Sequence, residues 1–148
     1  MTITVTAFQE QDYPKLVEIW YKAVRATHHF LTEADFDYYH QFVEEGALRT
    51  SELWVAVDGI GALLGFIGVE GQKIDTLFVD PQHFGRGTGR RLIAHIEALK
   101  GKPLQVDVNE QNEAACRFYL RCGFKPVGRS ESDDSGRPYP LIHMAQPE

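Results

Sequence analysis

The chain has 148 residues, of which 43% are hydrophobic, and it carries a formal net charge of −6 at pH 7. This length and composition fit one domain with a buried core. The acidic balance disfavours a nucleic-acid-binding protein, which needs a basic face, and mildly favours a cationic partner such as an amine. Neither a secretion signal nor a membrane span is visible in the sequence, so we expect a cytoplasmic protein without a membrane partner.

The cysteine and histidine patterns predict no metal site. Cys116 and Cys122 lie six residues apart on one predicted helix, a spacing that places them on different faces. We therefore expect reduced thiols, as in the cytoplasm. The six histidines also lack the spacing of metal ligands.

The first third of the chain is predicted to form a strand and two helices. Residues 3–8 alternate weakly and include β-branched side chains, which is typical of a strand. Apolar residues recur at helical spacing after Asp12 and after Thr32, so two amphipathic helices are expected, interrupted at residues 27–31. The predicted inward residues are Leu16, Val17, Trp20, Ala23 and Val24 in the first helix and Phe36, Tyr39, Phe42 and Val43 in the second.

The middle of the chain is predicted to form a three-stranded meander. Residues 53–57 and 63–69 are joined at Asp58-Gly59, a strong hairpin signal. A third strand at residues 74–79 ends before Pro81, because proline cannot donate to a sheet ladder.

Glycines stand at positions 85, 87 and 89, directly before a helical pattern that turns Leu92, Ile93, Ile96 and Leu99 inward. Such a loop leaves backbone N–H groups bare at a helix start, where the helix dipole adds partial positive charge. The stretch therefore predicts a cradle for a pyrophosphate. A dinucleotide is one alternative, since Asp107 follows at the distance of a ribose-binding acid. Against it, Arg90 stands where the third glycine of that fingerprint belongs.

The last third alternates strands and helices. Residues 104–108, 124–128 and 139–145 are predicted strands. One helix between them carries Ala115, Phe118, Tyr119 and Cys122 on its inward face. The order β-α-α-β-β-β-α-β-α-β-β predicts a mixed sheet with helices on both faces, an α+β or three-layer α/β fold.

Two spaced motifs resemble the GNAT superfamily, the GCN5-related N-acetyltransferases. One is Val79-x-Pro81-x-x-x-Gly85-x-Gly87-x-Gly89, and the other is Asn112 followed by Tyr119 and Gly123-Phe124. The resemblance implies a single domain over residues 1–148 with a mostly antiparallel sheet of about seven strands and about four helices. It implies an acetyl-CoA-dependent N-acetyltransferase in which a primary amine attacks directly in a ternary complex. On this resemblance, the acceptor is expected to be a small molecule or a protein lysine or N-terminus, and the enzyme is expected to be a monomer or homodimer.

The resemblance also assigns a cofactor site. The residues implied to bind acetyl-CoA are Leu77, Phe78, Val79, Phe84, Gly85, Arg86, Gly87, Thr88, Gly89, Arg90, Asn112 and Tyr119. Phe84 is a departure, because the family usually has arginine or glutamine there. Arg86, Arg90 or Arg91 is expected to supply the missing positive charge.

The catalytic residues implied are an acid and a base. Tyr119 is expected to protonate the departing thiolate. Asp75, His28 or a water is expected to take the proton of the amine. Asp75 alternates with Leu77 and Val79, which predicts a partly apolar setting near the thioester. His28 lies in the interhelical segment that forms the acceptor pocket in this superfamily.

The aromatic residues Phe30, Phe36, Tyr38, Tyr39, Trp54 and Tyr139 are candidate lining for that pocket. A non-catalytic acyl-CoA sensor stays open as a second alternative, because of the changed residue at Phe84.

Overall fold

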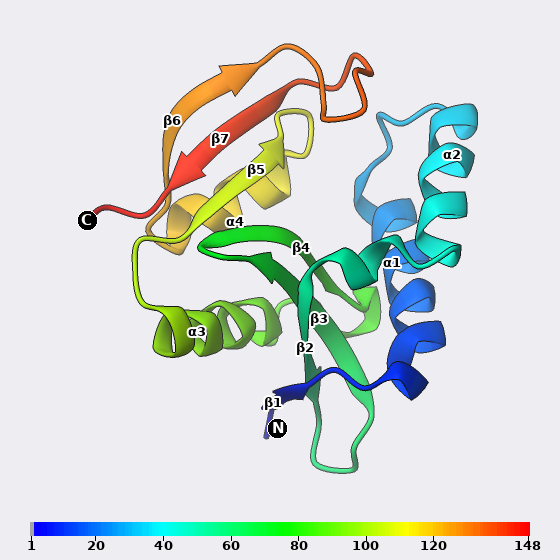
Figure 1. Cartoon of the computed structure of the whole chain (residues 1–148), viewed down its shortest axis with the longest axis vertical. Coiled ribbons are helices and arrows are strands. Elements are labelled where there is room, and N and C mark those ends of the chain that lie inside the picture. The colour runs from blue at the N-terminus through cyan, green and yellow to red at the C-terminus, as the bar shows by residue number, and fades with distance from the viewer. Residues whose placement is uncertain (1) are drawn as a thin grey trace.

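The computed structural model describes residues 2–148, in which a seven-stranded sheet lies between two pairs of helices (Figure 1). The predicted domain range begins one residue earlier, at Met1, outside the described residues. The strands are β1 (Thr4–Ala7), β2 (Glu52–Val57), β3 (Leu63–Glu70), β4 (Lys73–Val79), β5 (Gln105–Asn109), β6 (Lys125–Ser130) and β7 (Leu141–Ala145). The helices are α1 (Tyr13–Thr27), α2 (Glu33–Glu44), α3 (Thr88–Lys100) and α4 (Glu113–Arg121), with short 3-10 turns η1 (Glu10–Asp12), η2 (Ala47–Thr50) and η3 (Pro81–His83). The predicted element order and the α+β fold class are confirmed.

The sheet has the strand order β1-β2-β3-β4-β5-β7-β6, and β4–β5 is the parallel pair among antiparallel neighbours. Strands β4 and β5 pair only at Lys73 with Gln105 and at Ile74 with Val106. Beyond Ile74 the two strands separate (Figure 1). Within residues 2–148, the second half of β4 therefore has a paired strand on its β3 side and none on its β5 side.

Two apolar clusters hold the layers together, one on each face of the sheet. The cluster on the α3 and α4 face contains Leu92, Ile93 and Ile96 of α3 and Tyr119 of α4. The cluster on the α1 and α2 face contains Leu16, Ile19, Trp20 and Val24 of α1 and Phe36 and Val43 of α2. Burial of these helical stripes is the main reason that the amphipathic segments form helices here.

Some predicted inward positions are wrong. Phe42 is 47% exposed on the flank of α2, and Leu99 is 51% exposed in the last turn of α3, which ends at Lys100. Asp12 precedes α1 but its carboxylate caps the turn before the helix, accepting from the Gln9 amide at 3.0 Å. Thr32 caps α2 as predicted, accepting from the Asp35 amide at 3.1 Å.

A β-bulge changes the facing of residues in β4. Val69 pairs with Ile74 and Gly68 with Thr76, so Asp75 is the extra residue between two successive pairs. Ile74 and Leu77 consequently both face the α3 and α4 cluster, although they are three positions apart. Among residues 2–148, no helix is both long and apolar enough to cross a membrane.

Candidate active site

Two cavities adjoin beside the second half of β4. One, of about 500 Å³, is enclosed by the glycine loop, β4 and α4, and we call it the loop cavity. The other, of about 690 Å³, lies between α2, the loop 131–140 and β4, and we call it the α2 cavity. His28 and Phe78 line both cavities. A molecule in one cavity therefore meets a molecule in the other at these two side chains.

The glycine loop presents backbone donors to the loop cavity. Gly87, with φ of 82°, is the N-cap of α3, and the left-handed conformation there favours glycine. The amide of Arg91 makes the first helical hydrogen bond, to the Gly87 carbonyl at 3.0 Å, so the amides of Thr88 to Arg90 lack helical partners. The Thr88 hydroxyl is also buried without a hydrogen-bond partner among the described residues. These groups suit an anion at the helix N-terminus.

Gly87 matters for its backbone conformation, whereas Gly89 matters for the packing of α3 against α4. A Cβ atom at Gly89 would lie 2.9 Å from Cζ of Phe118 on α4. Glycine therefore lets α3 lie close to Phe118 of α4 without displacing this ring.

The arginines of this region are not equivalent. Arg90 lines the loop cavity, and its guanidinium donates to the Arg121 carbonyl at 3.3 Å. Arg91 points away, donating to the carbonyl of Ile3, the residue before β1, at 2.6 Å. Arg86 is outside the cavity lining, unlike every other residue that the sequence assigned to the cofactor. Phe84 lines the cavity and is 47% exposed.

The open edge of β4 forms one wall of the loop cavity. The Asp80 amide donates to the Leu64 carbonyl of β3 at 2.8 Å. Because strand amides alternate in direction, those of Leu77 and Val79 point to the opposite side, where β5 has separated. An extended ligand can pair with this edge as an added strand.

Helix α4 forms the facing wall. The Asn112 side chain caps this helix by accepting from the Ala115 amide at 3.1 Å, which leaves its NH2 group as a donor. Tyr119 is 7% exposed and packs between Phe118 and Phe124. Burial raises the pKa of the Tyr119 phenol above its usual value, so the hydroxyl keeps its proton at neutral pH.

His28 lies at the C-terminal end of α1, where its amide donates to the Val24 carbonyl at 2.8 Å. Its ring packs against Phe30 and Phe78. Burial, with a smaller contribution from the neighbouring His29, lowers the pKa of His28 to about 4. The imidazole is therefore neutral at pH 7 and offers a lone pair.

The structure differs from the prediction for Asp75 in two ways: the side chain lies on the other face of β4, and its surroundings are exposed rather than partly apolar. The bulge breaks the expected alternation with Leu77, so Asp75 lines the α2 cavity and not the loop cavity. The residue is exposed, and its carboxylate accepts from the Ser51 hydroxyl at 2.7 Å. This carboxylate is placed to meet a cation entering the α2 cavity rather than the thioester.

Negative charge dominates the α2 cavity. Its carboxylates are those of Glu70, Asp75, Asp107, Asp133 and Asp134. Lys73 is the cationic residue of the described lining, and it pairs with Asp107 at 2.8 Å. Asp107 also forms a hydrogen bond with Nδ1 of His143 at 2.6 Å. It is not part of the loop-cavity lining, so it is not placed to bind a ribose beside the glycine loop. The surplus of carboxylates favours a cationic occupant.

The predicted aromatic lining is correct in part. Tyr38, Tyr39 and Tyr139 line the α2 cavity. Trp54 instead packs against His95 on the α3 and α4 face, with the rings tilted by 54°, and Phe36 is 3% exposed in the core.

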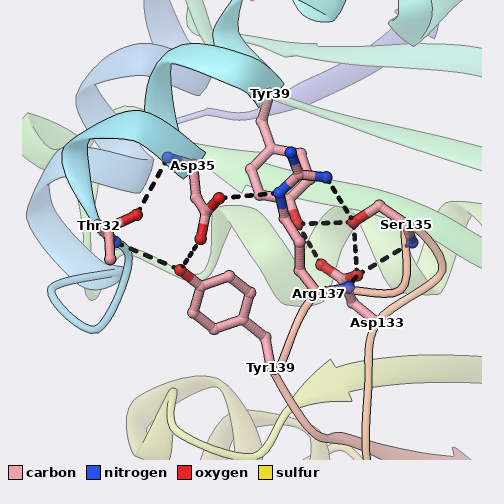
Figure 2. A network of polar contacts seen from close by, with 7 residues as sticks. All are labelled: Thr32, Asp35, Tyr39, Asp133, Ser135, Arg137 and Tyr139. Carbon is pink, nitrogen blue, oxygen red and sulfur yellow. Dashed lines mark hydrogen bonds and ion pairs between the residues drawn. The ribbon is translucent and has the colours of Figure 1, made fainter.

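A polar network fastens the loop 131–140 to α2, and we call it the latch (Figure 2). The Asp35 carboxylate accepts from the Tyr139 hydroxyl and, at 2.8 Å, from Nε of Arg137. The Tyr39 hydroxyl donates to Asp133, which also accepts from Ser135. The hydrogen bond from Tyr139 and then that from Arg137 hold the pKa of Asp35 below its usual value. Sequence patterns gave no sign of the latch, because its partners are about a hundred positions apart.

Comparison with known proteins places this arrangement in context. A family model described as an acetyltransferase (GNAT) domain matches residues 49–126. The peptidyl-lysine N-acetyltransferase YjaB of Escherichia coli (strain K12) is 42% identical over 146 residues, covering 98% of this chain and 97% of that protein. The solution structure of the apo form of YjaB from Escherichia coli has a TM-score of 0.88 at 40% identity, over 98% of this chain and 97% of that one. The PaiA N-acetyltransferase from Thermoplasma acidophilum, solved in complex with coenzyme A, shares the fold at a TM-score of 0.76 and 18% identity, over the full length of both chains.

Proposed function

The chain belongs to the GNAT acetyltransferase family, and we propose that it transfers the acetyl group of acetyl-CoA to the ε-amine of lysine in proteins. Acetyl-CoA-dependent acetylation follows from the family, and the lysine acceptor is the proposal. One observation carries it: the two cavities share His28 and Phe78, and the cavity without the glycine loop is acidic. The name of YjaB, peptidyl-lysine N-acetyltransferase, points to the same acceptor class.

Acetyl-CoA occupies the loop cavity in this proposal. Its pyrophosphate lies at the amides of Thr88 to Arg90, with Arg90 adding charge. The pantetheine arm extends along the open edge of β4 and receives a hydrogen bond from the Asn112 amide. The fit is supported by the unpartnered Thr88 hydroxyl and by the amides of Leu77 and Val79, which have no strand partner.

The lysine side chain enters through the α2 cavity. A lysine has a cationic head on an apolar stem, which matches carboxylates at the walls and aromatic rings between them. Asp75 holds the ammonium at the entrance, where it is exposed to water. The amine gives up one proton to solvent before it reaches the buried junction, because burial disfavours the charged form.

The chemical step takes place at the junction. The neutral amine attacks the thioester carbonyl carbon, the C–N bond forms, and the C–S bond breaks. The nitrogen gives its proton to Nε2 of His28, and the leaving thiolate takes a hydrogen bond and then a proton from Tyr119. Solvent restores the proton of Tyr119 and removes that of His28. The Leu77 and Val79 amides are the donors available to the carbonyl oxygen.

His28 is the base in this scheme and Asp75 is not. His28 lines both cavities, whereas Asp75 lines the α2 cavity alone. A low pKa makes His28 a weak base, but the nitrogen that it deprotonates is already bonded to the carbonyl carbon and is far more acidic than a free ammonium.

The test has two parts. Calorimetry with acetyl-CoA, CoA and NAD is expected to show binding of the two CoA species, and tight NAD binding without CoA binding would contradict the proposal. Thiol release is then measured with a lysine peptide and with a peptide in which arginine replaces that lysine. Release that needs the lysine is expected, whereas CoA binding without release on any amine would make the chain a sensor.

A further inference from the structure

Thr27, the last residue of α1, makes two hydrogen bonds through one hydroxyl. Its Oγ1 donates to the Ala23 carbonyl, one helical turn earlier, at 2.7 Å. The same oxygen lies 2.8 Å from Nδ1 of His28. The hydroxyl, the carbonyl and the imidazole thus form a short chain at the point where the two cavities meet.

The position of each hydrogen in this chain follows from the donors available. A carbonyl oxygen only accepts, so the single hydrogen of the Thr27 hydroxyl is used on Ala23. The contact with His28 then needs its hydrogen from the ring, which means that Nδ1 carries it. A neutral imidazole has one N–H, and Nε2 is left with a free lone pair.

The Nε2 atom of His28 is accessible. It has no hydrogen-bond partner among residues 2–148, and it is not one of the buried polar atoms without a partner. His28 is partly exposed and lines both cavities, so the accessible Nε2 is available to a molecule that reaches this ring.

We propose that Thr27 is a positioning residue: its hydroxyl holds His28 in the tautomer with hydrogen on Nδ1, so that Nε2 accepts the proton of the attacking amine. The proposal rests on the proposed function for the role of Nε2, whereas the tautomer itself does not depend on activity. Nε2–H is the alternative tautomer, and it would place a donor where the amine needs an acceptor.

The tautomer is measured directly in the wild-type protein. Long-range ¹H–¹⁵N correlation spectra at pH 7, assigned with His28→Gln, are expected to show Nδ1 of His28 protonated and Nε2 bare. A protonated Nε2 would overturn the proposal without any bearing on acetylation. In Thr27→Val the spectrum is expected to move toward the other tautomer or a mixture of both.

Kinetics tests the consequence for the reaction. Thr27→Val is expected to lower kcat about tenfold, a part of what a general base contributes. The KM for acetyl-CoA should change far less. Thr27→Ser, which keeps the hydroxyl, is expected to recover most of this loss, and Thr6→Val on the exposed part of β1 serves as the control for the same substitution.

A double-mutant comparison separates positioning from general damage. In the His28→Gln background, adding Thr27→Val is expected to cause no further loss of kcat, because the two residues act as one unit. An equal loss in both backgrounds would overturn the proposal. Absence of any acetylation by the wild-type enzyme, with the Nδ1–H tautomer present, would instead contradict the proposed function.

Discussion

The rings of His28 and Phe78 lie 6.4 Å apart between centroids and form the partition between the loop cavity and the α2 cavity. The imidazole comes from the end of α1 and the phenyl ring from the open half of β4, so the partition joins two layers of the fold. In the proposed scheme, the two rings lie between the thioester in the loop cavity and the acceptor in the α2 cavity.

Removing the Phe78 side chain should allow acetyl-CoA to be hydrolysed without transfer of the acetyl group to an acceptor. We expect Phe78→Ala to increase acetyl-CoA hydrolysis without acceptor severalfold and to decrease transfer to a lysine peptide, because water then reaches the thioester. Thiol release with and without peptide measures both rates. Phe78→Leu retains most of the bulk and is the control. Unchanged hydrolysis in Phe78→Ala would mean that the ring does not exclude water.

Tyr119 should affect turnover and not binding. Tyr119→Phe keeps the ring between Phe118 and Phe124 and removes only the hydroxyl. We expect kcat to fall roughly 100-fold, the lower end of what a general acid contributes. The Kd for acetyl-CoA from calorimetry should stay within about twofold. A kcat equal to that of the wild type would exclude the hydroxyl from the mechanism.

Two adjacent arginines provide a matched pair for the phosphate site. Arg90 lines the loop cavity, whereas Arg91 is bonded to the Ile3 carbonyl on the far side. Arg90→Gln is expected to raise the Kd for CoA about fivefold, equivalent to roughly 1 kcal/mol, and to weaken its salt dependence. Arg91→Gln should leave the Kd unchanged and lower the melting temperature. The reverse pattern would show that Arg91, and not Arg90, supplies the positive charge at the phosphate site.

The sequence predicted the parts of this site that depend on local pattern. The glycines before α3, the helical stripes and the order of strands all follow from spacing, because backbone conformation and periodic burial are local properties. The parts that depend on strand pairing were out of reach. Strict alternation along β4 placed Asp75 beside the thioester, but a bulge opposite Gly68 turns Asp75 to the other face of the sheet. The backbones are close at this bulge, because a Cβ at Gly68 would lie 2.6 Å from the Thr76 hydroxyl. The latch was missed for the same reason, since Asp35 and Tyr139 meet only in the folded chain.

Weakening the latch should reduce the affinity for the acceptor and leave the affinity for acetyl-CoA unchanged. Asp35→Asn removes the charge that pairs with Arg137 and weakens the hydrogen bond from Tyr139, so the loop 131–140 loses its attachment to α2. We expect the KM for a lysine peptide to rise about three- to tenfold while the Kd for acetyl-CoA is unchanged. Glu33→Gln, in the same helical turn but paired with Arg25 on the outer surface, is the control. A parallel change in both constants would indicate general loosening instead.

The pH dependence of the free energy of unfolding should reflect the low pKa of His28. Its pKa is about 4 in the folded protein and near 6.5 in the unfolded chain, so between these values the unfolded state binds more protons. The favourable contribution of the neutral ring is present above pH 6.5 and is lost as the pH falls through 4. The difference is on the order of 3 kcal/mol in the free energy of unfolding. His28→Gln is therefore expected to lose less stability than the wild type between pH 7 and pH 4, as measured by urea unfolding.

The neighbouring ring supplies the control for this measurement. His29 is exposed and contributes less than burial does to the low pKa of His28, so His29→Gln should keep most of the wild-type pH dependence. Carboxylates titrate in the same window, but they are common to all three proteins and cancel in the comparison. Equal slopes for His28→Gln and the wild type would show that the ring at the junction is not held neutral, and a general base at that position would then need a different explanation.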